Sequence, residues 1–280
     1  MAAIATAGPS PTNPCDLSPL MVCGDPTQYN PGTGMFWGFQ FGDLQVLKTA
    51  SGTSSPIGPG NFQLLDFGSG GSQVREDLAG GGKVCRDVGD NVQTAPGNTA
   101  GPTSQGLNTR FGIYNGGQIN ASAYPPDLVT TSSNPAITDN GTGPKYQGQA
   151  VTSNNGNLTA GGNAILDYND WRASVAACVA GGSGCQGNGV FERRMLKVVV
   201  GNCTGKQGGS TSIPVLGFGC YFVVQPVSGG GGDAQIFGQF VKECEGDNVA
   251  GPSPSTSSGP QIIQLYKTYL NGSGTPSTDS

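Results

Sequence analysis

The sequence predicts an α+β fold that is rich in β-structure, with mainly antiparallel sheets, a few short helices, and long loops rich in Gly, Asn, Ser and Thr. Apolar runs at 191–200, 218–224 and 234–241 follow one another with glycine-rich connections, which favours antiparallel strands. Hydrophobic residues make up 35% of the 280 residues and fall in blocks between 49 glycines and 20 prolines. Eight cysteines without a C-x-x-C pair predict a disulfide-stabilised fold.

The cysteines also indicate an oxidising compartment, because an even number without metal-binding spacing is typical of disulfide-bonded proteins. The candidate disulfide cysteines are Cys15, Cys23, Cys85, Cys178, Cys185, Cys203, Cys220 and Cys244. Two pairs are close in the sequence, Cys15 with Cys23 and Cys178 with Cys185, and we expect each to close a short loop. The pairing of the other four stays open, with Cys203–Cys220 as one candidate.

The N-terminal part is expected to become ordered at the first cysteine. Residues 1–14, rich in Ala, Pro and Thr, predict a flexible leader. The aromatic segment 36–41 and the alternating segment 44–48 are separated by a Gly-Asp turn, which predicts a hairpin. In 58–68, a Gly-Pro-Gly turn leads into an apolar run that is expected to form a buried strand.

Two short helical segments and one strand are expected next. Segment 73–79 runs into three glycines, which favour the end of a helix. The run 84–92 predicts a strand, and 107–111 predicts a short helix or turn. Arg110 is one of the few charges near this apolar piece. We expect it to be buried or half-buried against backbone carbonyls, and the alternative is a contact with a partner or ligand.

The composition changes in the middle of the chain. Between 115 and 164 it shifts to Gly, Asn, Thr, Ser and Pro, which predicts a loop-rich insertion, either a surface excursion or a small irregular subdomain. A helix is expected over 171–179, because Trp171, Val175 and Cys178 share one face. Asp167 or Asn169 is expected to cap it.

A single β-rich domain is expected over 15–270. Its last strand is assigned to 261–270, at a sheet edge, after a Pro/Ser linker at 250–260. Residues 271–280 are polar and are expected to form a disordered tail.

Charge and hydropathy argue against nucleic acid, anionic lipid or a membrane-spanning helix of this chain. The formal net charge is −5 and charged residues make up only 11%, so the chain offers no basic footprint for nucleic acid or anionic lipid. No run approaches the length of a membrane-spanning helix, and residues 1–7 lack the regions of a signal peptide. Because an extracytoplasmic protein needs an export route, we expect a leader or membrane anchor upstream.

The chain carries no histidine, which excludes His-based triads and His metal sites. A carboxylate hydrolase would use residues such as Asp66 and Glu76, whose spacing gives no rationale for acid–base chemistry. Segments 139–141 and 167–170 offer oxygens to calcium, but neither matches an EF-hand loop, and a turn and a helix cap fit them better. We therefore expect no enzymatic activity, no cofactor and no metal site.

A collinear set of motifs spans most of the chain, from about Cys15 to Tyr266. The motifs are Cys-Asp-Leu-Ser-Pro-Leu-Met-Val-Cys at 15–23, an aromatic segment ending in Leu47-Lys48, Gly58-Pro59-Gly60-Asn61-Phe62 with Leu65-Asp66, Pro96-Gly97-Asn98 with Gly101, Leu107-Asn108-Thr109-Arg110-Phe111, Tyr124-Pro125-Pro126, an arginine-led strand over 193–200 with Asn202-Cys203, Phe222-Val223-Val224, and Gly238-Gln239-Phe240-Val241. Together they resemble the extracytoplasmic portion of TadE/TadG-like Flp (tight adherence) pilus-assembly proteins.

The resemblance implies a structural or assembly role in surface attachment, without catalytic residues to carry over. It implies a location on the periplasmic side of the inner membrane or at the cell surface, with other pilus or envelope proteins as partners and self-association as a further option. The chain departs from the family by lacking the N-terminal hydrophobic helix, so membrane contact is expected only through an anchor missing from this chain. The alternative is a secreted carbohydrate-binding or adhesin module, in which Trp37 or Trp171 would stack on sugars.

Overall fold

The computed structural model describes residues 6–11, 15–50, 55–58, 61–68, 70–97, 99–116, 119–227, 234–242 and 261–266. The chain divides into two compact units, one over 14–246 and one that combines 1–13 with 247–280. No helix among these described residues is long and apolar enough to span a membrane.

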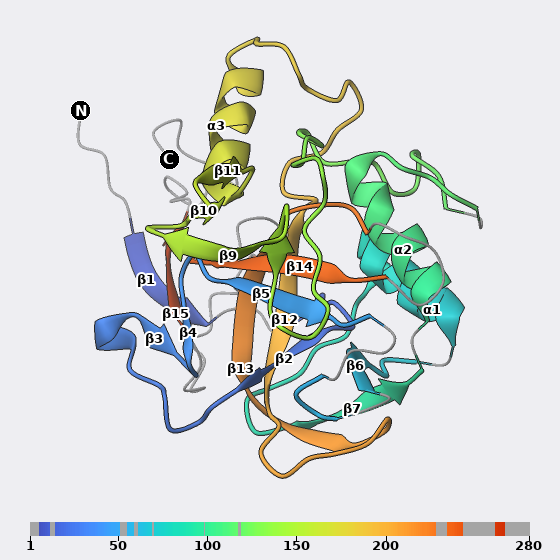
Figure 1. Ribbon diagram of the computed structural model, residues 1–280, viewed down its shortest axis with the longest axis vertical. Helices are drawn as coiled ribbons and strands as arrows, with labels where there is room; N and C mark the ends of the chain where they lie inside the picture. Colours follow the sequence, from blue (N-terminus) through green and yellow to red (C-terminus); the bar gives the residue numbers. More distant parts are fainter. Residues whose placement is uncertain are drawn as a thin grey trace, which may run out of the picture. The chain divides into compact units, whose positions relative to one another are not determined.

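A seven-stranded sheet forms the centre of the larger unit (Figure 1). The strand order in the sheet is β2 (Met21–Gly24), β12 (Met195–Asn202), β13 (Ser212–Val223), β14 (Ile236–Val241) and β5 (Leu44–Lys48). Two further strands extend it: β7 (Asn91–Pro96) pairs with the start of β13, and β6 (Asn61–Leu65) pairs with β7. Within this sheet, β2 and β12 are parallel and the other pairs are antiparallel. The β-rich, mainly antiparallel fold predicted from the three apolar runs is confirmed.

The sheet is covered on both faces, which explains why its central strands read as nearly continuous apolar runs. Side chains alternate at the end of β13: Tyr221 and Val223 join one core cluster, whereas Phe222 and the residue after the strand, Val224, join another. The first cluster packs against the helical segments α1 (Gly71–Glu76) and α2 (Ala100–Asn108). The second packs against α3 (Tyr168–Val179) and the small sheet described below.

Helices α1 and α2 begin without a side-chain cap, whereas α3 has one. α1 continues into a π-helical turn, η2 (Asp77–Gly81), and α2 continues into a 3-10 turn, η3 (Thr109–Phe111). A further 3-10 turn, η1, covers Pro31–Thr33. α3 starts at a capping box, in which Asp167 accepts from the backbone N–H of Asn169 and Asp170. The expected cap by Asp167 is therefore confirmed.

The loop-rich insertion contains regular structure at its C-terminal end. A four-stranded antiparallel sheet is formed by β8 (Lys145–Tyr146), β9 (Gln149–Asn154), β10 (Asn157–Ala160) and β11 (Asn163–Ile165). Its buried side chains, Tyr146, Leu158 and Ile165, belong to the same core cluster as Trp171 of α3. The C-terminal part of the insertion is thus a small meander that covers one face of the central sheet.

Two local predictions in the N-terminal half are wrong. The hairpin expected between 36–41 and 44–48 does not form: β3 (Met35–Phe36) pairs with β4 (Phe39–Gln40), and β5 pairs with β14. Phe36 and Phe41 pack on Phe240 of β14, so contacts with a distant strand outweigh the local turn. The strand expected over 84–92 begins only at Asn91, because a turn closed by a hydrogen bond from Asp90 N–H to Asp87 O comes first.

The last strand also differs from the prediction. β15 (Gln261–Tyr266) pairs with β1 (Thr6–Pro11) in a separate two-stranded antiparallel sheet, and not with the edge of the central sheet. The larger unit begins at residue 14, and 261–266 belongs to the same unit as 6–11. The tail at 271–280 and the linker at 250–260 lie outside the described residues.

Candidate functional site

The candidate cysteines form three disulfides within the described chain: Cys15–Cys85, Cys23–Cys203 and Cys178–Cys185. The local pair Cys178–Cys185 is confirmed, whereas the predictions of Cys15–Cys23 and Cys203–Cys220 are wrong. Cys23 lies on β2, parallel to β12 and opposite Gly201, so it meets Cys203 just beyond the end of that strand.

The remaining cysteines are consistent with an oxidised protein. Cys220 is disulfide-bonded, none of the described cysteines is free, and Cys244 lies outside the described residues. Three disulfides fit an extracellular protein, because such bonds persist in oxidising compartments.

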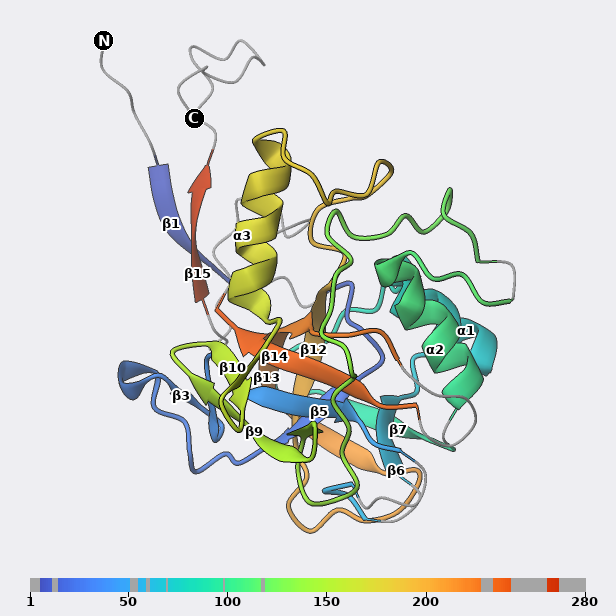
Figure 2. The same cartoon turned by 45° about the horizontal axis from the view of Figure 1, so that its top comes forward.

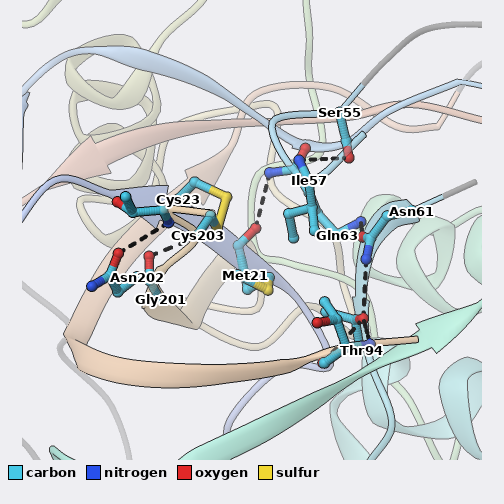
Figure 3. The surroundings of a disulfide bond; sticks show 12 residues. Met21, Cys23, Ser55, Ile57, Asn61, Gln63, Thr94, Gly201, Asn202 and Cys203 are labelled. Carbon is cyan, nitrogen blue, oxygen red and sulfur yellow. Dashed lines mark hydrogen bonds between the residues drawn. A yellow bond between two sulfur atoms is a disulfide. The ribbon is translucent and has the colours of Figure 1, made fainter. Parts of the chain in front are cut away.

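Polar side chains near the Cys23–Cys203 disulfide hold the sheet together (Figure 3). Gln63 has a left-handed backbone (φ 62°), and its Nε2 donates to Met21 O at 3.1 Å. Asn61 Nδ2 donates to Thr94 Oγ1 at 3.0 Å. These bonds join β6 to β2 and β7, so the polar groups beside this disulfide serve the fold.

The buried side chain of Arg194 also forms its hydrogen bonds and ring contacts within the protein. Arg194 is 1% exposed, and its guanidinium lies over the rings of Phe111 and Phe222, at 4.6 and 4.3 Å from their centroids. It donates to the carbonyls of Val129, Thr131, Val223 and Val224. Burial lowers the pKa of Arg194, and the Asp127 carboxylate opposes this shift.

Asp127 and Arg110 complete this structural network. Asp127 accepts hydrogen bonds from the N–H of Val129, the N–H of Arg194 and Trp171 Nε1. Arg110 is buried and donates to the carbonyls of Leu78 and Arg193, which confirms the expectation that it binds backbone.

The two tryptophans considered as sugar platforms are core residues. Trp171 is 4% exposed and belongs to the core cluster on the α3 side, and Trp37 is 7% exposed and belongs to the cluster on the opposite face. Neither ring is free to stack on a ligand, so this part of the carbohydrate-binding prediction is wrong.

The carboxylates considered for catalysis or calcium have local partners. Asp66 accepts from the N–H of Gly68, and Glu76 accepts from the Ser72 hydroxyl one helical turn away. Asp139 accepts from the N–H of Gly141 and Gly143 and so closes a turn, as expected. In the part of the chain that the structure describes, no group of three or more His, Cys, Asp or Glu is arranged to hold a metal ion.

The strongest candidate for a binding site is a pocket of 390 Å³ at the base of α3, which we call the α3 pocket. Four segments that are distant in sequence meet there: the turn before β5, the β9–β10 turn, the first turns of α3 and the end of β14. Figure 2 shows the β9–β10 hairpin beside the start of α3. The lining residues are Phe41, Gly42, Asn155, Gly156, Tyr168, Asn169, Arg172, Gln239, Phe240, Val241 and Lys242.

Gln239, which is 1% exposed on the central strand β14, fixes three of these segments. Its Nε2 donates to Gly156 O at 2.7 Å and to Gly42 O at 3.0 Å, and its Oε1 accepts from Tyr168 N–H at 2.9 Å. The two glycines allow close backbone contact, because a Cβ on Gly42 would lie only 2.7 Å from the Cα of Gly156. One buried amide therefore sets the geometry of the pocket.

The wall of the α3 pocket combines aromatic rings with cations. Phe41 stacks on Phe240 with ring centroids 4.9 Å apart, and Lys242 Nζ lies 5.6 Å from the centroid of Phe41. Tyr168 is half-buried, and the Arg172 guanidinium lies 5.8 Å from its ring centroid. Both cations are exposed to solvent.

The sequence alone did not single out this pocket. Its residues come from four segments, and none of them carries a recognisable motif. One signal was available: a glutamine in the middle of the apolar strand Ile-Phe-Gly-Gln-Phe-Val requires a buried polar partner. Comparison of the chain with protein-family models, with curated proteins and with solved structures gives no match.

Proposed function

We propose that this chain is a non-enzymatic binding component that acts outside the cytoplasm in surface attachment, within a Tad/Flp-type pilus assembly system. The observation that carries the proposal is the α3 pocket, where aromatic rings lie beside polar and charged side chains. The buried polar groups Arg194, Asp127 and Gln239 are bound by the fold. A pocket that combines aromatic rings with polar side chains is typical of recognition sites.

Two further points support this proposal. The disulfides fit an extracellular protein, which is where a pilus or envelope component acts. The collinear motifs between Cys15 and Tyr266 resemble TadE/TadG-like proteins, whose role is structural. The partners would be other pilus or envelope proteins.

Deletion of the gene in the source organism tests the role. We expect loss of pili or of surface adhesion, with recovery on complementation by the wild-type chain and by a Lys83→Gln variant, whose exposed lysine lies outside the pocket. Normal pilus assembly together with normal adhesion in the deletion strain would show that the proposed role is wrong.

A second candidate function is a secreted carbohydrate-binding or adhesin module, and the lining of the α3 pocket favours it. Aromatic rings and side-chain amides are the groups that proteins use to contact sugars, and Phe41, Tyr168, Asn155 and Asn169 supply them here. A glycan array on the purified protein tests this function. Reproducible binding that is lost in Tyr168→Ala and kept in Tyr29→Ala, an exposed tyrosine elsewhere, would support it.

A further inference from the structure

A second pocket lies where the two ends of the central sheet come together. β2 and β5 stand at opposite ends of the strand order, and the buried side chain of Gln63 joins them. Its Nε2 donates to Met21 O of β2 at 3.1 Å (Figure 3) and to Val46 O of β5 at 3.3 Å. Beside this bridge is a pocket of 260 Å³, which we call the seam pocket. Its lining residues are Val22, Cys23, Phe39, Leu44, Gln45, Val46, Thr49, Pro56, Gln63, Asp139, Gly141 and Pro144.

One polar group in the wall of the seam pocket is not used by the fold. Thr49 is 7% exposed, and its Oγ1 is buried without a hydrogen-bond partner. A buried hydroxyl in this state destabilises a protein, so it calls for an explanation beyond the fold. A hydroxyl in a pocket wall can serve a ligand, as donor or as acceptor.

Asp139 places a carboxylate in the same wall, and one of its oxygens is left for a ligand. Its Oδ1 accepts from the N–H groups of Gly141 and Gly143, and this turn holds the side chain in place. Its Oδ2 accepts no hydrogen bond from the described part of the chain. Asp139 is also the one charged side chain among the described lining residues, so the pocket favours a cationic ligand.

The rest of the chain leaves this charge in place. The stretches 51–54 and 59–60, which adjoin lining residues in sequence and lie outside the described residues, contain no Lys, Arg, Asp or Glu. Of the 13 basic residues, only Lys267 lies outside the described residues, and it belongs to the smaller unit. Lys48 and Lys145 are next in sequence to lining residues but are not among them.

The remaining wall is apolar and the space is small. Val22, Leu44, Val46 and the ring of Phe39 suit an aliphatic chain. The volume of 260 Å³ lies below the range of about 300–1,000 Å³ for small-ligand sites, which points to a ligand no larger than one long side chain. A primary ammonium group carries three donors, which suit acceptors such as a carboxylate and a hydroxyl.

We infer that the seam pocket binds a primary ammonium group on an aliphatic chain, as in a lysine side chain of a partner protein or in a free alkylamine. Asp139 Oδ2 and Thr49 Oγ1 accept from the ammonium group, and the apolar wall packs on the aliphatic chain. This site is separate from the α3 pocket, so the inference does not depend on the proposed function.

An NMR titration of the full chain, with its disulfides intact, tests the charge preference. The probes are pentylammonium, pentanol and pentanoate, which share the aliphatic chain and differ in charge. We expect pentylammonium to bind at least tenfold more tightly than pentanol, as for a charge-assisted hydrogen bond, and pentanoate to bind most weakly. The amide shifts should fall on β2, β5 and residues 139–144. Equal affinities for pentylammonium and pentanol, or shifts only elsewhere, would overturn the inference.

Two variants assign the acceptors. Asp139→Asn keeps the Oδ1 acceptor of the turn but not the charge, so it should lower the affinity for pentylammonium about tenfold. Asp16→Asn, at an exposed aspartate outside the pocket, is the matched control and should change nothing. Thr49→Val should weaken binding severalfold without lowering Tm, because the hydroxyl has no partner in the fold. Unchanged affinity in Asp139→Asn would overturn the site, and a lower Tm in Thr49→Val would overturn the role of the hydroxyl.

A second pair of probes identifies the source of the ammonium group. Blocked lysine, Nα-acetyl-lysine methylamide, carries it next to a peptide backbone, whereas pentylammonium carries it alone. Tighter binding of the blocked lysine would support a side chain of a partner protein, and tighter binding of pentylammonium would support a free amine. Binding of neither probe to a wild-type protein with a cooperative thermal transition would overturn the inference and leave the proposed function to its own tests.

Discussion

Replacement of Gln239 by leucine should destabilise the protein and disrupt the α3 pocket. The side chain makes three hydrogen bonds, to Gly42 O, Gly156 O and Tyr168 N–H, and is 1% exposed. A net contribution of about 1 kcal/mol for each bond gives a loss of about 3 kcal/mol in the free energy of unfolding. For a domain of this size the loss corresponds to a fall of about 6–12 °C in Tm.

Thermal and urea unfolding, followed by circular dichroism with the disulfides intact, measures this loss. Gln207→Leu, at an exposed glutamine outside the α3 pocket, is the matched control and should leave Tm unchanged. Gln239→Glu separates shape from hydrogen bonding, because a carboxylate keeps the acceptor for Tyr168 but loses the donors for the two glycine carbonyls. A Tm of Gln239→Leu within about 2 °C of the wild type would refute the view that this amide organises the pocket.

Three further predictions concern the core. Arg194→Met should lower the free energy of unfolding by about 3 kcal/mol or more, because it removes the donors for four backbone carbonyls. Urea unfolding measures this loss. An unchanged free energy of unfolding would contradict the structural role of Arg194. Peptide mapping without reduction should give Cys15–Cys85, Cys23–Cys203 and Cys178–Cys185, and a Cys15–Cys23 peptide would contradict the described pairing. Burial lowers the pKa of Lys48 from 10.5 to about 8, so the unfolded chain binds more protons between these values and stability should rise with pH there. Unfolding at a series of pH values should show that this rise is absent in Lys48→Met, and an identical pH profile in both proteins would count against it.

The sequence predicted what depends on local pattern. The three strongest strands were visible because β12, β13 and β14 are largely buried on both faces and therefore contain few polar residues. The cap at Asp167 followed from side-chain chemistry within one turn of helix. Cys178–Cys185 followed from its separation of only 7 residues.

Long-range pairing could not be predicted in this way. β2 pairs with β12, and β5 pairs with β14, across most of the chain, and no local signal encodes the partner of a strand. The wrong disulfides have the same cause, because Cys23 meets Cys203 only after β2 and β12 are aligned. The α3 pocket depends on Gln239 joining three distant segments, so it emerges only from the tertiary structure.

The parallel pairing of β2 with β12 constrains the order of folding. β2 is among the first strands to be synthesised, but its partner β12 comes much later in the chain. Cys23 at the end of β2 and Cys203 just after β12 are separated by 180 residues. Contacts of such high sequence separation make folding slow, since the closure of a long loop must precede them. The strands β2 and β5 therefore cannot pair until β12 and β14 have been synthesised. Strand edges that stay unpaired until the last strands arrive are prone to aggregation, so the slow steps of folding are also the steps at which this chain is most exposed to it.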